Sequence, residues 1–184
     1  MEAPAALSRF VEREYPRLVQ AADLLLDDRA VAEEVAQEAL LRAAGHWERV
    51  SGLESPGGWV HRVAVNLATS QLRRRRIARR ARSRLATPAV SADPDTATAL
   101  TVRAALARLP ASQRRLLVLR HVLGWTAVEI GDLDRARPAT VRQQLRRARE
   151  ALRSELGPEL AADIGPQLEP TAHDEERRHV NETR

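Results

Sequence analysis

Apolar residues recur at three- and four-residue steps along the first part of the chain. The members of this stripe are Leu7, Phe10, Val11, Leu18, Ala22, Leu25 and Leu26. Such spacing places them on one face of a helix, so the stripe predicts an amphipathic helix that buries this face. The sequence LDDRA that follows offers Asp27 and Asp28 as N-caps of a second helix.

The second predicted helix separates apolar from acidic positions. The residues expected to face inward are Val31, Val35, Ala39 and Leu40. The residues expected to face outward are Glu33, Glu34, Gln37 and Glu38. The segment that follows, GHWERVSGLESPGG (residues 45–58), is interpreted as a loop. Within it, Ser55 is a capping residue and Pro56 is a first-turn proline, and together they predict the start of the next helix.

A third predicted helix ends in the arginine run QLRRRRIARRARSR, residues 71–84. Its apolar side is expected to hold Trp59, Val63, Leu67 and Ile77. A polar face that leads into the run carries Trp59, Arg62, Asn66 and Ser70. Aromatic, amide and guanidinium groups together suit stacking on unpaired bases and contact with a nucleic-acid backbone. Two plainer interpretations stay open: Trp59 as a core residue, and the run as a solvated helix end favoured by the helix dipole.

Residues 85–99, LATPAVSADPDTATA, lack apolar periodicity and are predicted to form a flexible linker. The basic residues are concentrated on either side of this linker. Residues 71–84 carry eight Arg and no acid, and residues 101–156 carry twelve Arg against five acids, although the net charge is only +5. Two basic blocks on either side of a spacer indicate two contacts with a polyanion.

After the linker, the apolar spacing predicts one helix that ends near Leu109 and a second that begins at about Ala111. The second is expected to bury Leu116, Leu119 and Val122. Gly124 is a natural helix stop. Thr126 and Glu129 then form a capping box, which starts a short helix.

A tight turn at DRAR (residues 134–137) leads to Pro138, the expected first residue of the last helix. Its predicted buried stripe is Val141, Leu145, Ala148 and Leu152. The residues predicted to face away from the core are Thr140, Arg142, Gln143, Gln144, Arg146, Arg147 and Arg149. This layout is that of a helix-turn-helix, in which Gln reads adenine and Arg reads guanine. The alternative is an ordinary Arg-rich solvent face.

These patterns predict an all-α chain with a helical bundle over residues 1–84, the linker over 85–99 and a helix-turn-helix domain over 100–156. The tail, residues 157–184, has three prolines, net charge −4 and little periodicity. It is predicted to be disordered. Two roles for this acidic tail are considered: it competes with DNA for the C-terminal domain, or it is an inert extension.

Composition excludes several classes of function. The chain has no cysteine, so disulfides, thiolate metal sites and thiol catalysis are excluded. The five histidines show no metal-ligand spacing, and neither a phosphate loop nor a nucleophile beside a base appears, so no enzyme, cofactor or metal is expected. No signal peptide or membrane span is apparent, which predicts a cytoplasmic protein without membrane insertion. Every basic residue is Arg, which suits phosphate and guanine, although a GC-rich genome also accounts for it.

Three stretches resemble the bacterial extracytoplasmic-function (ECF) sigma factors. AEEVAQEAL (32–40) is similar to the family's region 2.2 signature, and WVHRVAVN (59–66) to its region 2.4. ALARLPASQRRLLVLRHVLGWTAVEI (105–130), followed by ATVRQQLRRAREALRSEL (139–156), resembles region 4. The resemblance implies a non-catalytic protein with a region 2 domain and a region 4 domain, which gives core RNA polymerase its promoter specificity.

The resemblance also implies partners for each surface. Region 2.2 residues Glu33, Glu34, Gln37 and Glu38 would contact core RNA polymerase, through the β′ coiled coil, with further contacts to the β subunit. The minus-ten element would be bound by residues 46–56 and by Trp59, Arg62, Asn66, Arg73 and Arg74. The minus-thirty-five element would fall to Thr140, Arg142, Gln143, Arg146 and Arg147, with Arg149 on phosphate. An anti-sigma factor is a further expected partner.

Three departures from the family pattern accompany the resemblance. Asp134, Arg135 and Arg137 stand where region 4 usually has Leu-Gly and a Ser cap, so a residue other than glycine must take a strained conformation or the turn must change shape. Ser70 replaces the usual Asp of region 2.4, and Leu40 replaces an aromatic residue of region 2.2. The rival interpretation is a stand-alone helix-turn-helix regulator that binds operators without polymerase.

Overall fold

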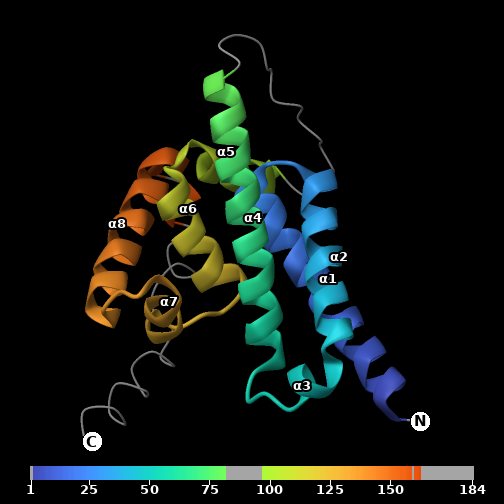
Figure 1. Ribbon diagram of the computed structural model, residues 1–184. Helices are drawn as coiled ribbons and strands as arrows, with labels where there is room; N and C mark the ends of the chain where they lie inside the picture. Colours follow the sequence, from blue (N-terminus) through green and yellow to red (C-terminus); the bar gives the residue numbers. More distant parts are fainter. Residues whose placement is uncertain (1, 82–96, 159, 163–184) are drawn as a thin grey trace, which may run out of the picture. The chain divides into compact units, whose positions relative to one another are not determined.

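The computed structural model describes residues 2–81, 97–158 and 160–162, and every element within these ranges is helical (Figure 1). The chain divides into two compact units, residues 1–94 and 95–184. The described part confirms the predicted all-α class. The predicted linker lies largely outside the described residues, but its last three residues form the first turn of a helix and do not belong to a linker.

The first unit is a bundle of α1 (Glu2–Leu26), α2 (Arg29–Gly45) and α4 (Pro56–Ala81), with the short α3 (Trp47–Ser51) between α2 and α4. Helices α1, α2 and α4 lie side by side and contact one another pairwise (Figure 1). The predicted stripe of α1 is confirmed at five positions, which are buried: Phe10, Leu18, Ala22, Leu25 and Leu26. On α2, Val35, Ala39 and Leu40 are buried as predicted, together with Ala32, Ala36 and Ala43.

The corner between α1 and α2 is closed by its two aspartates. The Asp28 carboxylate accepts a hydrogen bond from the Val31 backbone N–H at 3.2 Å, which confirms it as the N-cap of α2. Asp27 is not the cap; it takes a left-handed conformation with φ of 52°. Left-handed backbone is uncommon outside glycine, but aspartate tolerates it better than most residues. The corner therefore uses one aspartate for the turn and the other for the helix start.

Two predictions for the first unit are wrong in detail. The loop predicted over residues 45–58 contains α3, which buries Val50 and brings the Trp47 ring to 5.1 Å from the Phe10 ring. Helix α4 buries Val60, Ala64, Val65 and Ala68, whereas Trp59, Val63 and Leu67 are only half-buried. Ile77 is 61% exposed. The buried side of α4 therefore carries two valines and two alanines, and Trp59, Val63 and Leu67 lie at its edge.

The second unit contains α5 (Ala97–Arg108), α6 (Ala111–Leu117), a π-helical turn η1 (Val118–Val122), α7 (Ala127–Asp134) and α8 (Pro138–Leu156). Helix α8 contacts α5, α6 and α7. Its predicted stripe is confirmed, because Val141, Leu145, Ala148 and Leu152 are all buried, as is Leu156. The helix predicted from Ala111 changes to the wider π geometry at Val118, and its predicted core residue Val122 is only half-buried.

Glycines follow two of the helical segments in the second unit, and one of them is the predicted helix stop Gly124. The backbone turns at Gly124 with φ of 75°, and the Trp125 N–H then donates to the Leu119 carbonyl at 2.9 Å. Beyond α8, the Ala161 N–H donates to the Gly157 carbonyl at 3.0 Å, so one helical turn follows Gly157. Residues 163–184, the larger part of the tail that was predicted to be disordered, lie outside the described residues.

Candidate polymerase and nucleic-acid interfaces

Helix α2 presents its polar side to solvent because its alanine and valine side is buried against α1 and α4. Glu34, Gln37 and Glu38 are exposed and Glu33 is half-buried, so the four predicted residues share one surface. Leu41 lies on the same side and is 67% exposed. The sequence prediction did not include Leu41, although its position outside the apolar stripe was a signal for it. These five residues form the α2 face.

The charge of the α2 face is partly balanced by neighbouring arginines. Arg29 Nε donates to Glu33 Oε1 at 2.8 Å, and Arg42 Nε donates to Glu38 Oε1 at the same distance. The hydrogen bond to Glu33 raises the pKa of Arg29 above its usual value. Exposed pairs of this kind contribute little to stability. The α2 face is therefore a mixed surface of three acids, an amide and one large apolar side chain, and it is flanked by Arg29 and Arg42.

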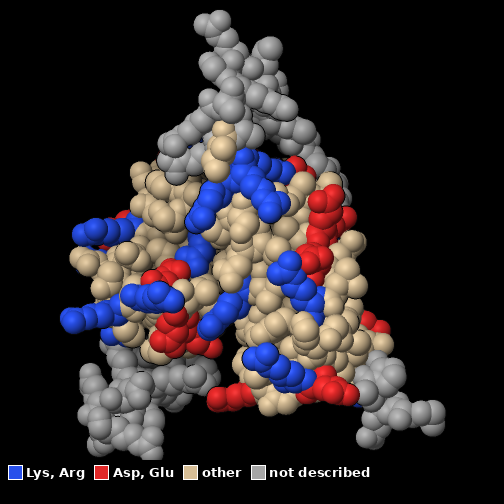
Figure 2. All heavy atoms as spheres, in the orientation of Figure 1, with Lys and Arg blue, Asp and Glu red and all other residues tan. Residues whose placement is uncertain are grey.

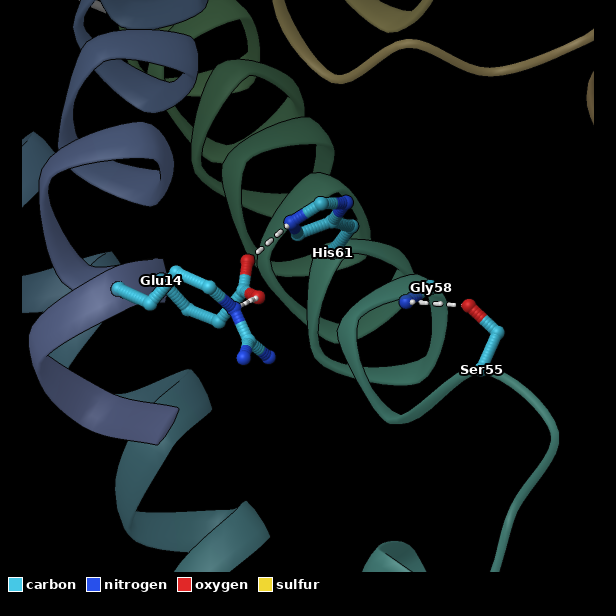
Figure 3. Close-up of polar contacts among 5 residues, drawn as sticks. Glu14, Ser55, Gly58 and His61 are labelled. Atoms are coloured by element: carbon cyan, nitrogen blue, oxygen red, sulfur yellow. Dashed lines mark hydrogen bonds and ion pairs between the residues drawn. The ribbon is translucent and has the colours of Figure 1, made fainter. Parts of the chain in front are cut away.

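The beginning of α4 is fixed by a local cap and by a buried hydrogen-bonded pair (Figure 3). Ser55 Oγ accepts a hydrogen bond from the Gly58 N–H at 3.1 Å, which confirms the predicted cap. Glu14 Oε2 of α1 lies 2.9 Å from His61 Nε2 of α4, and both residues are buried. A Cβ atom on Gly57 would lie only 3.2 Å from Glu14 Oε1, so glycine leaves room for the carboxylate.

Burial and hydrogen bonding compete at this pair. Burial raises the pKa of Glu14, but hydrogen bonds from Arg13 and His61 outweigh it and hold the pKa below its usual value. Burial lowers the pKa of His61, and the hydrogen bond to Glu14 only partly offsets this. His61 is therefore neutral near pH 7 and donates from Nε2 to the Glu14 carboxylate. The sequence prediction missed both residues, because nothing local to either one indicates a partner 47 positions away.

The outward side of α4 carries the residues predicted for the minus-ten element. Successive positions among 59, 62, 66 and 73 are three, four and seven residues apart, which brings them to one helix face. Arg62, Asn66, Arg73 and Arg74 are exposed, and Trp59 is half-buried. Part of the Trp59 side chain is therefore covered by the protein, and the rest is accessible to a partner. We call these five residues the α4 face.

Two polar residues of α4 form hydrogen bonds within the protein. Arg75 donates from Nη1 to the Leu26 carbonyl at 3.2 Å and from Nη2 to Asp28 Oδ2 at 2.6 Å. The backbone hydrogen bond from Val31 and the contact with Arg75 together hold the pKa of Asp28 below its usual value. The Ser70 hydroxyl donates to the Asn66 carbonyl at 2.9 Å. The arginine run therefore includes a structural residue that the sequence prediction did not separate from Arg73 and Arg74.

Helix α8 shows its predicted polar residues on the side away from the buried stripe. Thr140, Arg142, Gln143, Arg146 and Arg147 are all exposed. Arg149 was predicted to face outward as well, but it is only half-buried because it lies beside the stripe residue Ala148. No acidic residue interrupts α8 before Glu150. We call the five exposed residues the α8 face.

The helix before α8 has the predicted capping box. The Glu129 N–H donates to Thr126 Oγ1 at 3.2 Å, and the Thr126 N–H donates to Glu129 Oε2 at 2.7 Å. Arg135 follows the end of α7 with φ of 54° and ψ of 40°, which confirms that a residue other than glycine takes the left-handed position of this turn. Pro138 then starts α8. Helices α7 and α8 with this turn form the predicted helix-turn-helix.

Charged side chains are unevenly distributed over the molecular surface. Figure 2 shows basic side chains gathered along α4 and acidic side chains along α2. Within the described residues, no group of three or more His, Asp or Glu is arranged to hold a metal ion. No helix in the described part of the chain is long and apolar enough to cross a membrane.

Comparison with known proteins agrees with this geometry. Residues 10–78 match the Sigma-70 region 2 family, and residues 99–152 match the Sigma-70 region 4 family. The chain is 34% identical to the ECF RNA polymerase sigma factor SigL of Mycobacterium tuberculosis, over 84% of this chain and 91% of SigL. The chain belongs to the ECF sigma factors. The α2 and α4 faces lie within the first family match, and the α8 face lies within the second.

Two further similarities describe the extent of the relationship. This ECF sigma factor is 33% identical to SigG of Mycobacterium tuberculosis over 81% of its own length, but it spans only 48% of SigG. The sigma factor RpoE of Bartonella quintana, solved in complex with the anti-sigma factor NepR, has the same fold with a TM-score of 0.67 and 21% identity. That match covers 81% of this chain and 95% of RpoE.

Proposed function

We propose that this chain binds core RNA polymerase and directs it to promoters that have matching minus-ten and minus-thirty-five elements. The observation that carries the proposal is the presence, in one chain, of an exposed Arg and Gln face on a helix-turn-helix and of a second, separate basic face on α4. A stand-alone regulator needs only the first of these. The proposed role involves no bond chemistry by this chain, and it is exercised in the cytoplasm.

Each face has a proposed partner. The α8 face enters the major groove of the minus-thirty-five element, where Arg142, Gln143, Arg146 and Arg147 contact base edges. Each good two-bond pair between a side chain and a base is worth about 1–3 kcal/mol of discrimination. Thr140 at the start of α8 and the half-buried Arg149 are placed on the DNA backbone.

The α4 face is proposed to hold the opened strand of the minus-ten element. Removing a base from the stack costs a few kcal/mol, so contacts available only in the melted state must return this free energy. Trp59 and Asn66 supply an aromatic edge and an amide, and Arg62, Arg73 and Arg74 supply charge for the phosphates. The segment from His46 to Pro56, including α3, lies before this face in the chain.

The α2 face is proposed to bind the β′ coiled coil of core polymerase, with further contacts to the β subunit. Glu34 and Gln37 are exposed, and the Glu38 carboxylate accepts a hydrogen bond from Arg42. The similarity to RpoE, which was solved with the anti-sigma factor NepR, supports an anti-sigma factor as a further partner. Such a partner would act by covering the same faces that bind polymerase and DNA.

Transcription with purified core polymerase tests the proposal. The wild-type chain and core enzyme select promoters from a randomised DNA library, and the selected DNA is then transcribed with and without the chain. We expect initiation at fixed positions only when the chain is present. Tight, specific duplex binding by the chain alone, without promoter-dependent initiation, would support the stand-alone regulator.

A further inference from the structure

The turn between α7 and α8 has an unusual backbone for its sequence. Arg135 takes the left-handed conformation, which a side-chain Cβ disfavours and which glycine adopts without this cost. The glycine of this region is instead Gly131, inside α7. A Cβ atom there would lie 2.6 Å from the Ala136 carbonyl oxygen, so Gly131 is required for close approach of the turn. The turn therefore carries strain at Arg135 that must be offset elsewhere.

A side-chain pair lies next to the strained residue. Arg115 of α6 donates from Nη1 to Asp134 Oδ2 and from Nη2 to Asp134 Oδ1, each at 2.8 Å. A two-pronged contact between a guanidinium and a carboxylate fixes the direction of both planes as well as their distance. The side chains are only 20% and 32% exposed, so water competes less for them than at a surface pair.

The position of the pair links it to the recognition helix. Asp134 is the last residue of α7 and directly precedes Arg135. Helix α6 contacts α8, and α7 contacts α8 as well. The pair thus joins α6 to the end of α7 at the point where the chain turns into α8. The Ala136 N–H donates to the Gly131 carbonyl at 2.9 Å, which closes the turn on the backbone side.

We propose that the Arg115–Asp134 pair is a positioning element, which holds the strained turn and thereby sets the placement of α8 on duplex DNA. The inference rests on the proposed function of the α8 face. It assigns to two residues outside that face a role in promoter selection. Asp134 and Arg135 stand where the family usually has Leu-Gly, so the pair accompanies the loss of glycine.

The test uses the full chain with core polymerase on promoters selected by the wild type. Arg115→Gln and Asp134→Ala are each expected to weaken promoter binding by roughly 10-fold, the loss expected for a charge-assisted pair. They are also expected to change the preferred spacing between the two promoter elements. Arg135→Gly, added to Asp134→Ala, removes the strain and is expected to restore binding to within about twofold of the wild type.

A control in the same unit separates positioning from general stability. Arg108 of α5 and Glu155 of α8 form an exposed ion pair at 3.7 Å, away from the turn. Glu155→Gln is expected to leave promoter binding and spacing preference unchanged. Unchanged binding and spacing in both Arg115→Gln and Asp134→Ala would overturn the inference. Failure of Arg135→Gly to restore binding would overturn it as well, because the pair would then act by another route.

Hydrogen exchange of the turn amides tests the same inference without DNA. In the full chain, Asp134→Ala is expected to speed exchange of the Ala136 amide by roughly 10-fold, and Arg135→Gly is expected to reverse this. Unchanged exchange of the Ala136 amide in Asp134→Ala would contradict the proposal that the Arg115–Asp134 pair holds the turn. A wild-type chain that selects no promoter with core polymerase would instead contradict the proposed function, and the exchange result would still decide the role of the pair.

Discussion

Helices α4 and α8 both present arginine-rich faces, but they are held in place by different means. Helix α8 lies on its unit through one stripe of aliphatic residues, and the remaining surface is polar. Helix α4 contacts both α1 and α2, and it buries two valines and two alanines. Its beginning is held by the buried Glu14–His61 pair, whereas the start of α8 follows the partly exposed Arg115–Asp134 pair. A similar surface chemistry is thus supported by one apolar stripe in the second unit, and by apolar packing together with a buried polar pair in the first.

The largest expected difference concerns the core. Leu145→Ala removes a fully buried aliphatic side chain from the stripe of α8, so it is expected to destabilise the second unit by about 2–5 kcal/mol. Leu67→Ala removes a half-buried side chain from α4 and is expected to cost about half as much or less. Denaturant unfolding, monitored separately in each unit, measures both. Equal losses would show that α4 depends on large apolar side chains as much as α8 does.

The next difference concerns sequence reading. Arg146→Ala is expected to remove about 1–3 kcal/mol of discrimination at one position of the minus-thirty-five element. Arg74→Ala on the α4 face is expected to weaken binding to all promoters similarly and to reduce the salt dependence of binding, because we propose that Arg74 contacts phosphate. Binding of the holoenzyme to promoters with single base changes, at several salt concentrations, measures both. Loss of base discrimination in Arg74→Ala would contradict the assignment.

Two neighbouring arginines sharpen the comparison within α4. Arg75→Ala breaks the contacts with Leu26 and Asp28, and because these contacts are partly exposed we expect a loss of about 1 kcal/mol from the first unit. Arg74→Ala is expected to change the free energy of unfolding by less than about 0.5 kcal/mol. Thermal unfolding of the two variants provides the matched measurement. The reverse order would mean that Arg74, and not Arg75, supports the fold.

The smallest expected effect is a slope of stability with pH. The pKa of His61 in the folded chain is below its ordinary value of 6.5, so the unfolded chain binds the proton more readily. The stability that depends on neutral His61 is therefore present above pH 6.5 and is lost as the pH falls below it. Glu14 adds a loss in the same direction below its ordinary pKa of 4.5. Arg13 and Arg17 disfavour a positive charge on His61 and strengthen the trend.

The first unit should accordingly lose stability between pH 7 and pH 5. His61→Gln keeps a hydrogen-bond donor beside Glu14 but cannot take up a proton, so the slope over this range should become smaller. Denaturant midpoints of both proteins at several pH values measure it. A slope that is unaffected by the substitution would place its origin in other groups.

Much of the second unit could be predicted from the sequence because its signals are local. The capping box at Thr126, the turn before Pro138 and the stripe of α8 each depend on residues within a few positions of one another. The strain at Arg135 also followed from the absence of glycine. The pair beside this turn could not be predicted, because Arg115 and Asp134 are 19 positions apart and both resemble ordinary surface charges in the sequence.

The first unit was harder to predict for a physical reason. The buried side of α4 carries Val60, Ala64, Val65 and Ala68, and its two alanines give a weak signal in an apolar pattern. The stripe of α4 was therefore placed on the larger side chains of Trp59, Val63, Leu67 and Ile77. Helix α3 was missed because five residues are too few to show a period. The pairing of Glu14 with His61 depends on the packing of α1 on α4, which no local pattern contains.

The central claim is that α4 reads opened DNA and α8 reads duplex DNA. Binding of the holoenzyme to two synthetic DNAs tests it most directly: one carries the minus-ten element as a single strand, and the other carries the minus-thirty-five element as a duplex. The account predicts that Arg62→Ala with Arg74→Ala weakens binding to the first DNA only, and that Arg142→Ala with Arg146→Ala weakens binding to the second only. Equal losses on both DNAs from either pair of substitutions would contradict the account.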